Sequence, residues 1–366
     1  MRVLLTGARA PATLELARLC ARAGHLVHVA DTHRWHICRG SRLIASAHVL
    51  PAPRDGRAAY VDAVRQLVDR LGIDVIVPTC EEIFHLAAHR NQLGTRVACE
   101  PLSVLGVLHD KWRFISACDA AGVRRPATWL LDRADTLQSL PPGMYIVKPR
   151  FSRFATRVLL WHSADAQPTL DGVTKQAWIA QEHLSGPTFC SWSVSTNGRL
   201  DAHVTYATDS TAGPRGAAIA FHTVRHAGVL QWVQQFIAHH QLTGQFAFDF
   251  IDAPSGLMAI ECNPRLTSGV HCFRTAPDVV RTLLDPTAAA PVTVHEPEPL
   301  QYFQSRVAMR LYRAPVGPGA GLLDAEDDPW PQRLQCISWA HLLASSALAG
   351  MDPRRWSTRD IEWNGE

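Results

Sequence analysis

Residues 245–265 read QFAFDFIDAPSGLMAIECNPR, and this stretch decides the fold of the chain. Two apolar runs, 245–251 and 257–261, flank a Pro-Ser-Gly turn, which predicts two adjacent antiparallel strands. Because side chains alternate between the two faces of a strand, Asp249 and Glu261 can face the same side near the middle of the pair. The segment therefore predicts two carboxylates on one face of a hairpin.

The residues that end this hairpin extend the same face. Asn263 follows Glu261 by two positions and Arg265 follows by two more, so both point the same way. Two carboxylates and an amide oxygen suit Mg²⁺, which completes its shell with waters and nucleotide phosphates. Arg265 would stabilise charge on a transferring phosphoryl group. The alternative is an ordinary hairpin with solvated acids. Because Asp249 lies among aromatic residues and needs a partner there, we favour metal ligation by Asp249, Glu261 and Asn263.

The chain has 366 residues, which is enough for two or three packed domains. Near its N-terminus, predicted strands at 2–6, 25–31 and 73–77 alternate with helical patterns, the clearest of them over 58–71. This alternation predicts a parallel sheet with right-handed crossovers. The first turn lacks the three-glycine spacing of a dinucleotide site, and Asp31 fits a loop residue as well as a ribose ligand. We expect a Rossmann-like domain without a dinucleotide.

Beyond residue 105 the pattern of elements changes. It predicts a helix over 110–122, strands at 127–131 and 144–148, and a strand–turn–strand unit over 176–195. A helix at 229–240 then precedes the hairpin described above, and another helix covers 336–348.

Composition argues against several classes of protein. The formal net charge of +3 is too small to indicate nucleic acid or an anionic membrane as a partner. Nine cysteines without paired spacing are typical of reduced thiols in a cytosolic protein. No signal peptide and no run of about 18 apolar residues is evident, so we expect a soluble, cytoplasmic protein.

The set Glu261-x-Asn263-x-Arg265, with Asp249 on the preceding strand, resembles the metal and phosphate motif of the ATP-grasp superfamily. The resemblance covers roughly residues 1–300 and is nearest to stand-alone enzymes related to the carbamoyl-phosphate synthetase large subunit and biotin carboxylase. In such enzymes one lysine starts a helix and a second ends a strand of the small lobe. Lys111 and Lys148 fall at those places, and a lysine ammonium is suited to a phosphate.

The resemblance also implies the organisation of the chain. It implies an α/β protein, α+β in the nucleotide lobes, in which an ATP-grasp fold is preceded by a Rossmann-like parallel-sheet domain. In chain order, the implied parts are a Rossmann-like domain (1–105), a small ATP-binding lobe (106–182), a large metal-bearing lobe (183–300) and a C-terminal extension (301–366).

The hinge between the two lobes is matched by Gln181, Glu182 and Leu184. In the family, one side chain and the neighbouring backbone read the adenine there, and an acid can hold the ribose. A solvated turn acid is an equal alternative for Glu182. Thr188 stands where the family usually carries an acid, which weakens the expectation of a ribose contact at that position.

The loop after Lys148 also departs from the family pattern, in which it is rich in glycine so that backbone N–H groups cover the phosphates. Residues 150–157 contain no glycine. Side-chain donors from Ser152, Arg153 or Thr156 would replace backbone donors in this chain, and the affinity for the nucleotide would change with them.

Other residues fit substrate contacts less specifically. The loop at 266–271 is a plausible wall on the acceptor side, and Glu81 and Glu82 follow a strand end where a substrate amine could bind. His85 and His89 have the i, i+4 spacing of a zinc pair. No third ligand is evident, so we interpret them as part of a helix face.

The resemblance implies a carboxylate–amine ligase that uses ATP and Mg²⁺, with Mn²⁺ as an alternative ion. ATP would phosphorylate a carboxylate, an amine would displace the phosphate, and ADP and phosphate would leave. Lys148, Arg265 and Arg215 would hold the acyl phosphate, although Arg215 fits a solvated loop arginine equally well. A small-molecule kinase and a non-catalytic nucleotide-binding protein are the alternatives. The expected partners are small carboxylates and amines, with a homodimer common among the resembled enzymes.

Overall fold

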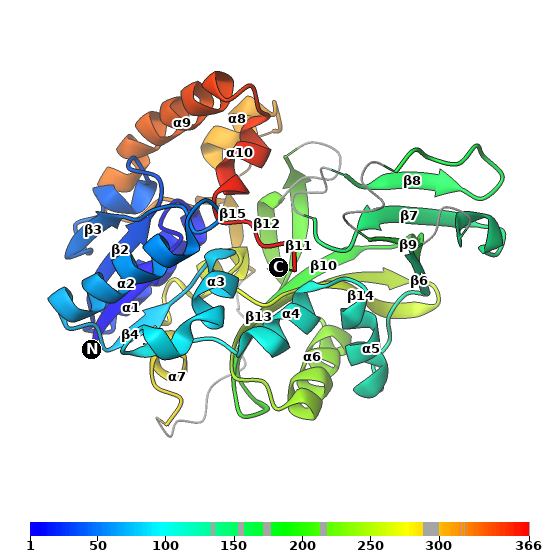
Figure 1. Cartoon of the computed structure of the whole chain (residues 1–366), viewed down its shortest axis with the longest axis horizontal. Coiled ribbons are helices and arrows are strands. Elements are labelled where there is room, and N and C mark those ends of the chain that lie inside the picture. The colour runs from blue at the N-terminus through cyan, green and yellow to red at the C-terminus, as the bar shows by residue number, and fades with distance from the viewer. Residues whose placement is uncertain are drawn as a thin grey trace.

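The computed structural model describes the following parts of the chain: residues 1–132, 136–152, 157–170, 177–212, 218–287, 300–315, 317 and 319–365. Three β-sheets organise them (Figure 1). The parallel sheet lies at one end of the molecule and a four-stranded sheet at the other, with a seven-stranded sheet between them.

The N-terminal sheet is entirely parallel and has the strand order β3-β2-β1-β4-β5. Its strands are β1 (Arg2–Thr6), β2 (Leu26–Asp31), β3 (Ser46–Val49), β4 (Val75–Val77) and β5 (Arg96–Val97). The helices that follow strands β1, β3 and β4 are α1 (Pro11–Arg22), α2 (Arg57–Leu71) and α3 (Glu82–Ala88). The central strand is buried on both faces, because Leu4 and Leu5 are both inaccessible to solvent. This is the predicted Rossmann-like sheet.

The four-stranded sheet is antiparallel and has the order β6-β9-β7-β8. Its strands are β6 (Thr128–Leu131), β7 (Met144–Pro149), β8 (Leu159–His162) and β9 (Trp178–Glu182). Tyr145, Trp161 and Trp178 lie in its apolar core. Strands β7 and β9 are neighbours, so the ends of both strands meet at one place.

The seven-stranded sheet has the order β14-β13-β10-β11-β12-β15-β16. Its strands are β10 (Thr188–Thr196), β11 (Arg199–Thr211), β12 (Ala218–Val224), β13 (Gly244–Ala253), β14 (Gly256–Asn263), β15 (Tyr302–Gln304) and β16 (Ala320–Gly321). Helix α6 (Ala227–His240) packs on one face, where Trp232 and Phe236 contact Phe248. Phe248 is buried on that face, so the side chains that alternate with it on β13 face the other way.

The helix predicted over 110–122 is confirmed as α5, which begins later than predicted and spans Arg113–Ala120. A separate helix, α4 (Leu102–His109), precedes it. Asp110 has extended backbone, accepts the N–H of Trp112 at 3.0 Å and forms an ion pair with Arg150. These contacts separate the two helices, so Lys111 lies in the connection between them. The predicted helix at 229–240 and the strands at 245–251 and 257–261 are confirmed, with longer ends than predicted.

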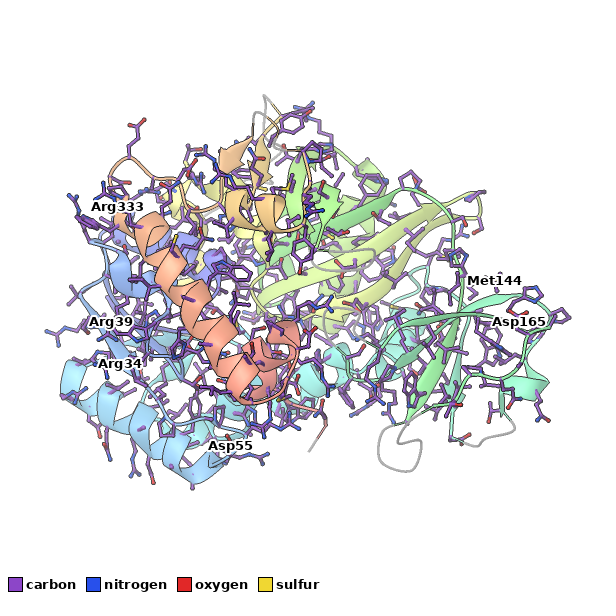
Figure 2. The ribbon with its side chains drawn as sticks, turned by 90° about the horizontal axis from the view of Figure 1, so that it is seen from above. Arg34, Arg39, Asp55, Met144, Asp165 and Arg333 are labelled. Atoms are coloured by element: carbon purple, nitrogen blue, oxygen red, sulfur yellow. The ribbon has the colours of Figure 1, made fainter. Side chains whose placement is uncertain are left out.

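The C-terminal part returns to the N-terminal domain. It contains α8 (Arg306–Leu311), α9 (Trp330–Leu348) and α10 (Pro353–Arg359). Helix α9 lies across the N-terminal domain, at the opposite end of the molecule from Met144 and Asp165 of the four-stranded sheet (Figure 2). The remaining helices are α7 (Val280–Leu284) and the short 3₁₀ turns η1 (Ile37–Gly40), η2 (Arg90–Gln92), η3 (Thr136–Ser139), η4 (Ser268–Phe273) and η5 (Pro277–Val279).

A buried ion pair joins this C-terminal part to α1. The Arg18 Nε and the Asp328 Oδ2 are 2.9 Å apart, and both side chains are inaccessible to solvent. We expect Arg18→Leu to lower the free energy of unfolding by about 3–5 kcal/mol, because it leaves a buried carboxylate without its cation. Arg18→Leu with Asp328→Leu should recover most of that loss. Chemical denaturation measures both, and equal losses in the single and double variants would contradict the prediction.

Among the described residues, no helix is both long enough and apolar enough to cross a membrane. None of the nine cysteines forms a disulfide, as the sequence predicted.

Candidate active site

The predicted hairpin brings Asp249 and Glu261 together. They are register partners on β13 and β14, with an irregularity in the pairing directly after Asp249. The Asn263 amide nitrogen lies 3.5 Å from Asp249 Oδ2 and 3.4 Å from Glu261 Oε1. Rotation of the Asn263 side-chain amide by 180° would exchange its nitrogen and oxygen, so that the oxygen lies beside the two carboxylates. The three side chains thus converge, on the face of β13 opposite Phe248.

The two carboxylates perturb each other. Burial, and then the charge of Glu261, raise the pKa of Asp249 to about 7. Burial alone would also raise the pKa of Glu261, but the ammonium groups of Lys111 and Lys148 lower it to about 2. A bound divalent cation would favour joint ionisation of two such adjacent acids. The donor set fits a hard divalent ion.

Lys111 lies between this pair of carboxylates and the segment that follows β7. Its Nζ lies 3.3 Å from Glu261 Oε2 and donates to the carbonyl oxygen of Ser152 at 3.2 Å. The Lys111 side chain is only 5% exposed, whereas that of Glu261 is 28% exposed. The cluster is therefore open to solvent on the side of the acids. Ser152 lies beside it as predicted, but its contact with Lys111 is made by the main chain.

Lys148 is the penultimate residue of β7, one position before the strand ends, and its Nζ donates to Gln181 Oε1 on the neighbouring β9 at 2.9 Å. Gln181 in turn donates to Thr128 Oγ1 at 3.2 Å. Burial lowers the pKa of Lys148 to about 8, against the opposing effect of Glu261. The side chains of Lys148 and Gln181, which are both predicted nucleotide contacts, are thus hydrogen-bonded to each other.

This lowered pKa predicts a pH dependence of phosphate binding. Protonated Lys148 is the form that attracts a phosphate, and in the free protein it loses its proton as the pH rises through about 8. We expect the affinity for ADP to fall roughly tenfold between pH 7 and pH 9. Isothermal titration calorimetry at several pH values measures this change. An affinity that stays constant up to pH 9 would show that the Lys148 charge does not contribute.

Arg265 lies directly beyond the carboxylates. Its Nη2 donates to Asn263 Oδ1 at 3.2 Å and its Nη1 to the Leu266 carbonyl at 3.4 Å, while its buried Nε has no hydrogen-bond partner among the residues that the structure describes. A buried guanidinium N–H without an acceptor is costly. A phosphate oxygen would supply that acceptor.

The predicted hinge residues Glu182 and Leu184 follow Gln181, which accepts the hydrogen bond from Lys148. The Glu182 side chain accepts the N–H of Ala127 at 2.9 Å, so it joins the end of β9 to the residue that precedes β6. Leu184 follows, partly exposed, on the segment that leads into β10. At Gly186 a Cβ atom would lie 2.1 Å from the Asp252 carbonyl, which explains the glycine in this turn.

Three of the predicted contacts, Arg153, Thr156 and Arg215, lie outside the described residues. One contact was missed by the sequence prediction. The Cys190 thiol, which is paired in register with Asp249 from β10, forms a hydrogen bond with the Asp249 carboxylate. Only the strand register brings it there, so no local pattern could have indicated it.

The N-terminal domain holds its own polar residues tightly. The Asp31 carboxylate accepts from the backbone and the side chain of Arg9, so both of its oxygens are engaged by that residue. One oxygen of Glu82 accepts from Thr6 Oγ1 at 2.6 Å and from two backbone N–H groups. Glu82 thus secures the carboxyl ends of β1 and β4.

His85 and His89, which the sequence analysis interpreted as part of a helix face, lie at the end of α3. His85 belongs to the helix and His89 directly follows it, with His89 Nδ1 3.0 Å from the His85 carbonyl. Within the described part of the chain, no group of three or more His, Cys, Asp and Glu side chains is placed to hold a metal ion. The cluster around Asp249 differs from such groups because its third oxygen donor is an amide.

Comparison with known proteins supports the fold assignment. Neither known protein families nor curated protein sequences give a match. Among solved structures, the chain is similar to an L-amino acid ligase from Bacillus licheniformis, with 15% identity, 78% of this chain and 74% of that chain covered, and a TM-score of 0.63. It is also similar to N5-carboxyaminoimidazole synthetase from Staphylococcus aureus complexed with ADP, with 13% identity, 80% and 79% covered, and a TM-score of 0.63.

A third similar structure is the biotin carboxylase domain dimer of the Hydrogenobacter thermophilus 2-oxoglutarate carboxylase, in complex with MgADP, ADP and bicarbonate. It has 13% identity, with 80% of this chain and 71% of that chain covered, and a TM-score of 0.61. The chain therefore has the ATP-grasp fold, and the resemblance to this superfamily and to biotin carboxylase is confirmed at the level of the fold.

Proposed function

We propose that this protein is an ATP-dependent carboxylate–amine ligase that works through an acyl phosphate and releases ADP and phosphate. The observation that carries the proposal is the convergence of Asp249, Glu261 and Asn263 with Lys111 and Lys148 on one open face. The names of the similar structures, which include an amino acid ligase and a synthetase complexed with ADP, support the same class of reaction.

Each residue of the cluster has a distinct role in this proposal. Asp249, Glu261 and Asn263 would hold a magnesium ion, which when bound neutralises charge on the outer phosphates of ATP. Lys111 and Lys148 would contact the phosphates from the small-lobe side, and Arg265 would use its unpartnered Nε on the transferring phosphoryl group. The chain then needs no covalent nucleophile, because positioning and charge neutralisation suffice.

The proposed reaction has two steps. A carboxylate oxygen attacks the terminal phosphorus of ATP, and the bond to ADP breaks. An amine then attacks the acyl carbon, the bond to phosphate breaks, and the amine loses a proton to solvent. Exclusion of water during these steps would protect the acyl phosphate.

The test is ADP release from wild-type protein with Mg-ATP, screened against pools of small carboxylates with and without amines. The proposal predicts ADP formation that requires both components, together with a condensed product detected by mass spectrometry. Formation of AMP in place of ADP would eliminate the acyl-phosphate route. A phosphorylated product without any amine would instead identify a kinase.

A further inference from the structure

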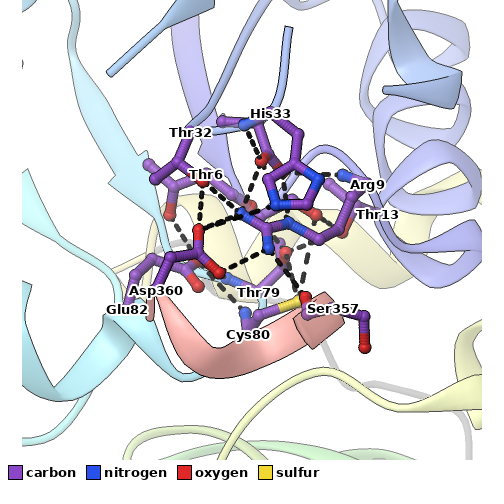
Figure 3. Close-up of polar contacts among 12 residues, drawn as sticks. Thr6, Arg9, Thr13, Thr32, His33, Thr79, Cys80, Glu82, Ser357 and Asp360 are labelled. Atoms are coloured by element: carbon purple, nitrogen blue, oxygen red, sulfur yellow. Dashed lines mark hydrogen bonds and ion pairs between the residues drawn. The ribbon is translucent and has the colours of Figure 1, made fainter. Parts of the chain in front are cut away.

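The end of the chain crosses from the N-terminal domain to the nucleotide lobe. Residues 357–365, here called the strap, are anchored at one end on Arg9 (Figure 3). The Arg9 guanidinium donates to both carboxylate oxygens of Asp360, at 2.8 and 2.7 Å, and to the Ser357 carbonyl at 2.7 Å. Thr32 donates to the same carboxylate. A bidentate pair of this kind fixes position as well as charge.

Further contacts continue along the strap. The Arg54 backbone N–H donates to the Asp360 carbonyl at 3.2 Å, and its side chain donates to Glu362 Oε2 at 2.6 Å. Ile361 is 3% exposed and Trp363 is 7% exposed, so apolar side chains of the strap are buried. The strap is thus docked by several independent contacts.

The far end of the strap enters a cluster of four aromatic rings. Trp363 stacks on Phe84 of α3, with ring centroids 4.7 Å apart and an interplanar angle of 14°. It meets Phe151 edge-on at 5.5 Å and His109 at 6.3 Å. His109 also lies 5.8 Å from Phe151. Edge-to-face and offset contacts of this kind are favourable beyond the apolar area they bury.

Two rings of this cluster adjoin the proposed phosphate contacts. His109 lies two residues before Lys111, and Phe151 directly precedes Ser152, whose carbonyl accepts from Lys111 Nζ. The Lys111 backbone N–H also donates to the Arg150 carbonyl at 3.3 Å. Trp363 therefore packs against both segments that set the place of the Lys111 ammonium.

We propose that the strap positions the two segments, 109–111 and 150–152, that place the phosphate-binding Lys111, and that Trp363 is the positioning residue through which it acts. The inference rests on the proposed function, because it assumes that Lys111 binds the phosphates of a nucleotide. It assigns the ion pair between Arg9 of the N-terminal domain and Asp360 of the strap an effect on nucleotide affinity in another lobe.

The experiment is calorimetric titration of MgADP into the whole chain of residues 1–366 and five variants of it. We expect Trp363→Ala to weaken binding about tenfold and Trp363→Phe, which retains an aromatic ring, to stay within about threefold of wild type. Asp360→Asn should weaken binding by a factor of about 3–5 in the wild-type background, since a neutral amide then replaces the carboxylate that pairs with Arg9 in the strap. It should have no further effect in the Trp363→Ala background, because the two residues act through one connection.

The fifth variant, Trp356→Phe, is the matched control. Trp356 lies in α10 directly before the strap, and its Nε1 donates to Ser345 Oγ at 2.9 Å. Its replacement removes this hydrogen bond without touching the ring cluster, so MgADP affinity should stay at the wild-type value. Wild-type affinity in Trp363→Ala, accompanied by a lower Tm, would overturn the proposal and leave a purely structural strap. Failure of wild-type protein to bind MgADP would overturn the proposed function as well, which distinguishes the two failures.

Discussion

Asp249→Asn should reduce ADP formation by at least about 1,000-fold, because it removes one ligand of the proposed ion and the charge that the ion requires. The same change should raise the Tm of the metal-free protein at pH 8. The pKa of Asp249, raised to about 7, lies above that of an unfolded aspartate. Ionised Asp249 therefore costs stability in the folded protein as the pH rises toward 7, and asparagine avoids that cost.

The matched control for this prediction is Asp252→Asn. Asp252 lies on the same strand, has a 43% exposed side chain and lies 3.6 Å from His226. Its replacement should change neither the rate of ADP formation nor the Tm measurably. A loss of activity in both variants would point to disturbance of β13 rather than loss of a ligand. A lower Tm in Asp249→Asn would contradict the claim that ionised Asp249, whose pKa is raised in the folded protein, costs stability.

Lys148→Met should weaken MgADP binding about 100-fold, since hydrogen bonds between a buried charge and its ligand are worth a few kcal/mol. Lys148→Arg should not restore binding. The Lys148 side chain is 5% exposed and fits against Gln181 as a single donor, and a planar guanidinium needs more room and different acceptors. Calorimetry with MgADP measures both variants.

The control for Lys148 is Arg125→Met. This change removes one positive charge from a surface ion pair with Asp119, whose oxygen lies 2.9 Å away. Nucleotide affinity should remain within about twofold of wild type, because exposed charges are screened by solvent and salt. Equal weakening in Arg125→Met and Lys148→Met would show that only the net charge matters. Full affinity in Lys148→Arg would reject the proposed single-donor contact.

Local sequence pattern was sufficient to predict the hairpin and the shared face of Asp249 and Glu261. Alternation in strands fixes the face of each side chain, and the turn between the runs fixes the partner strand. Lys148 was predictable for a similar reason, since an apolar run ended at it. These features depend on neighbours in sequence, so they are visible in one sequence.

Contacts between distant segments were not predictable in this way. Lys148 meets Gln181 because β7 and β9 pair, and Cys190 meets Asp249 because β10 and β13 pair. The break before Lys111 depends on the ion pair of Asp110 with Arg150, which no helical pattern reveals. The docking of the strap was the least predictable contact, because Arg9 and Asp360 belong to opposite ends of the chain.

The most direct test of the central claim is a crystal structure of the protein with Mn²⁺ and ADP, in which anomalous scattering locates the ion. The account predicts one Mn²⁺ bonded to oxygens of Asp249, Glu261 and Asn263 and to the ADP phosphates, with Lys148 within hydrogen-bond distance of a phosphate. An ion bound elsewhere, or ADP bound with these three side chains still contacting only one another, would contradict it.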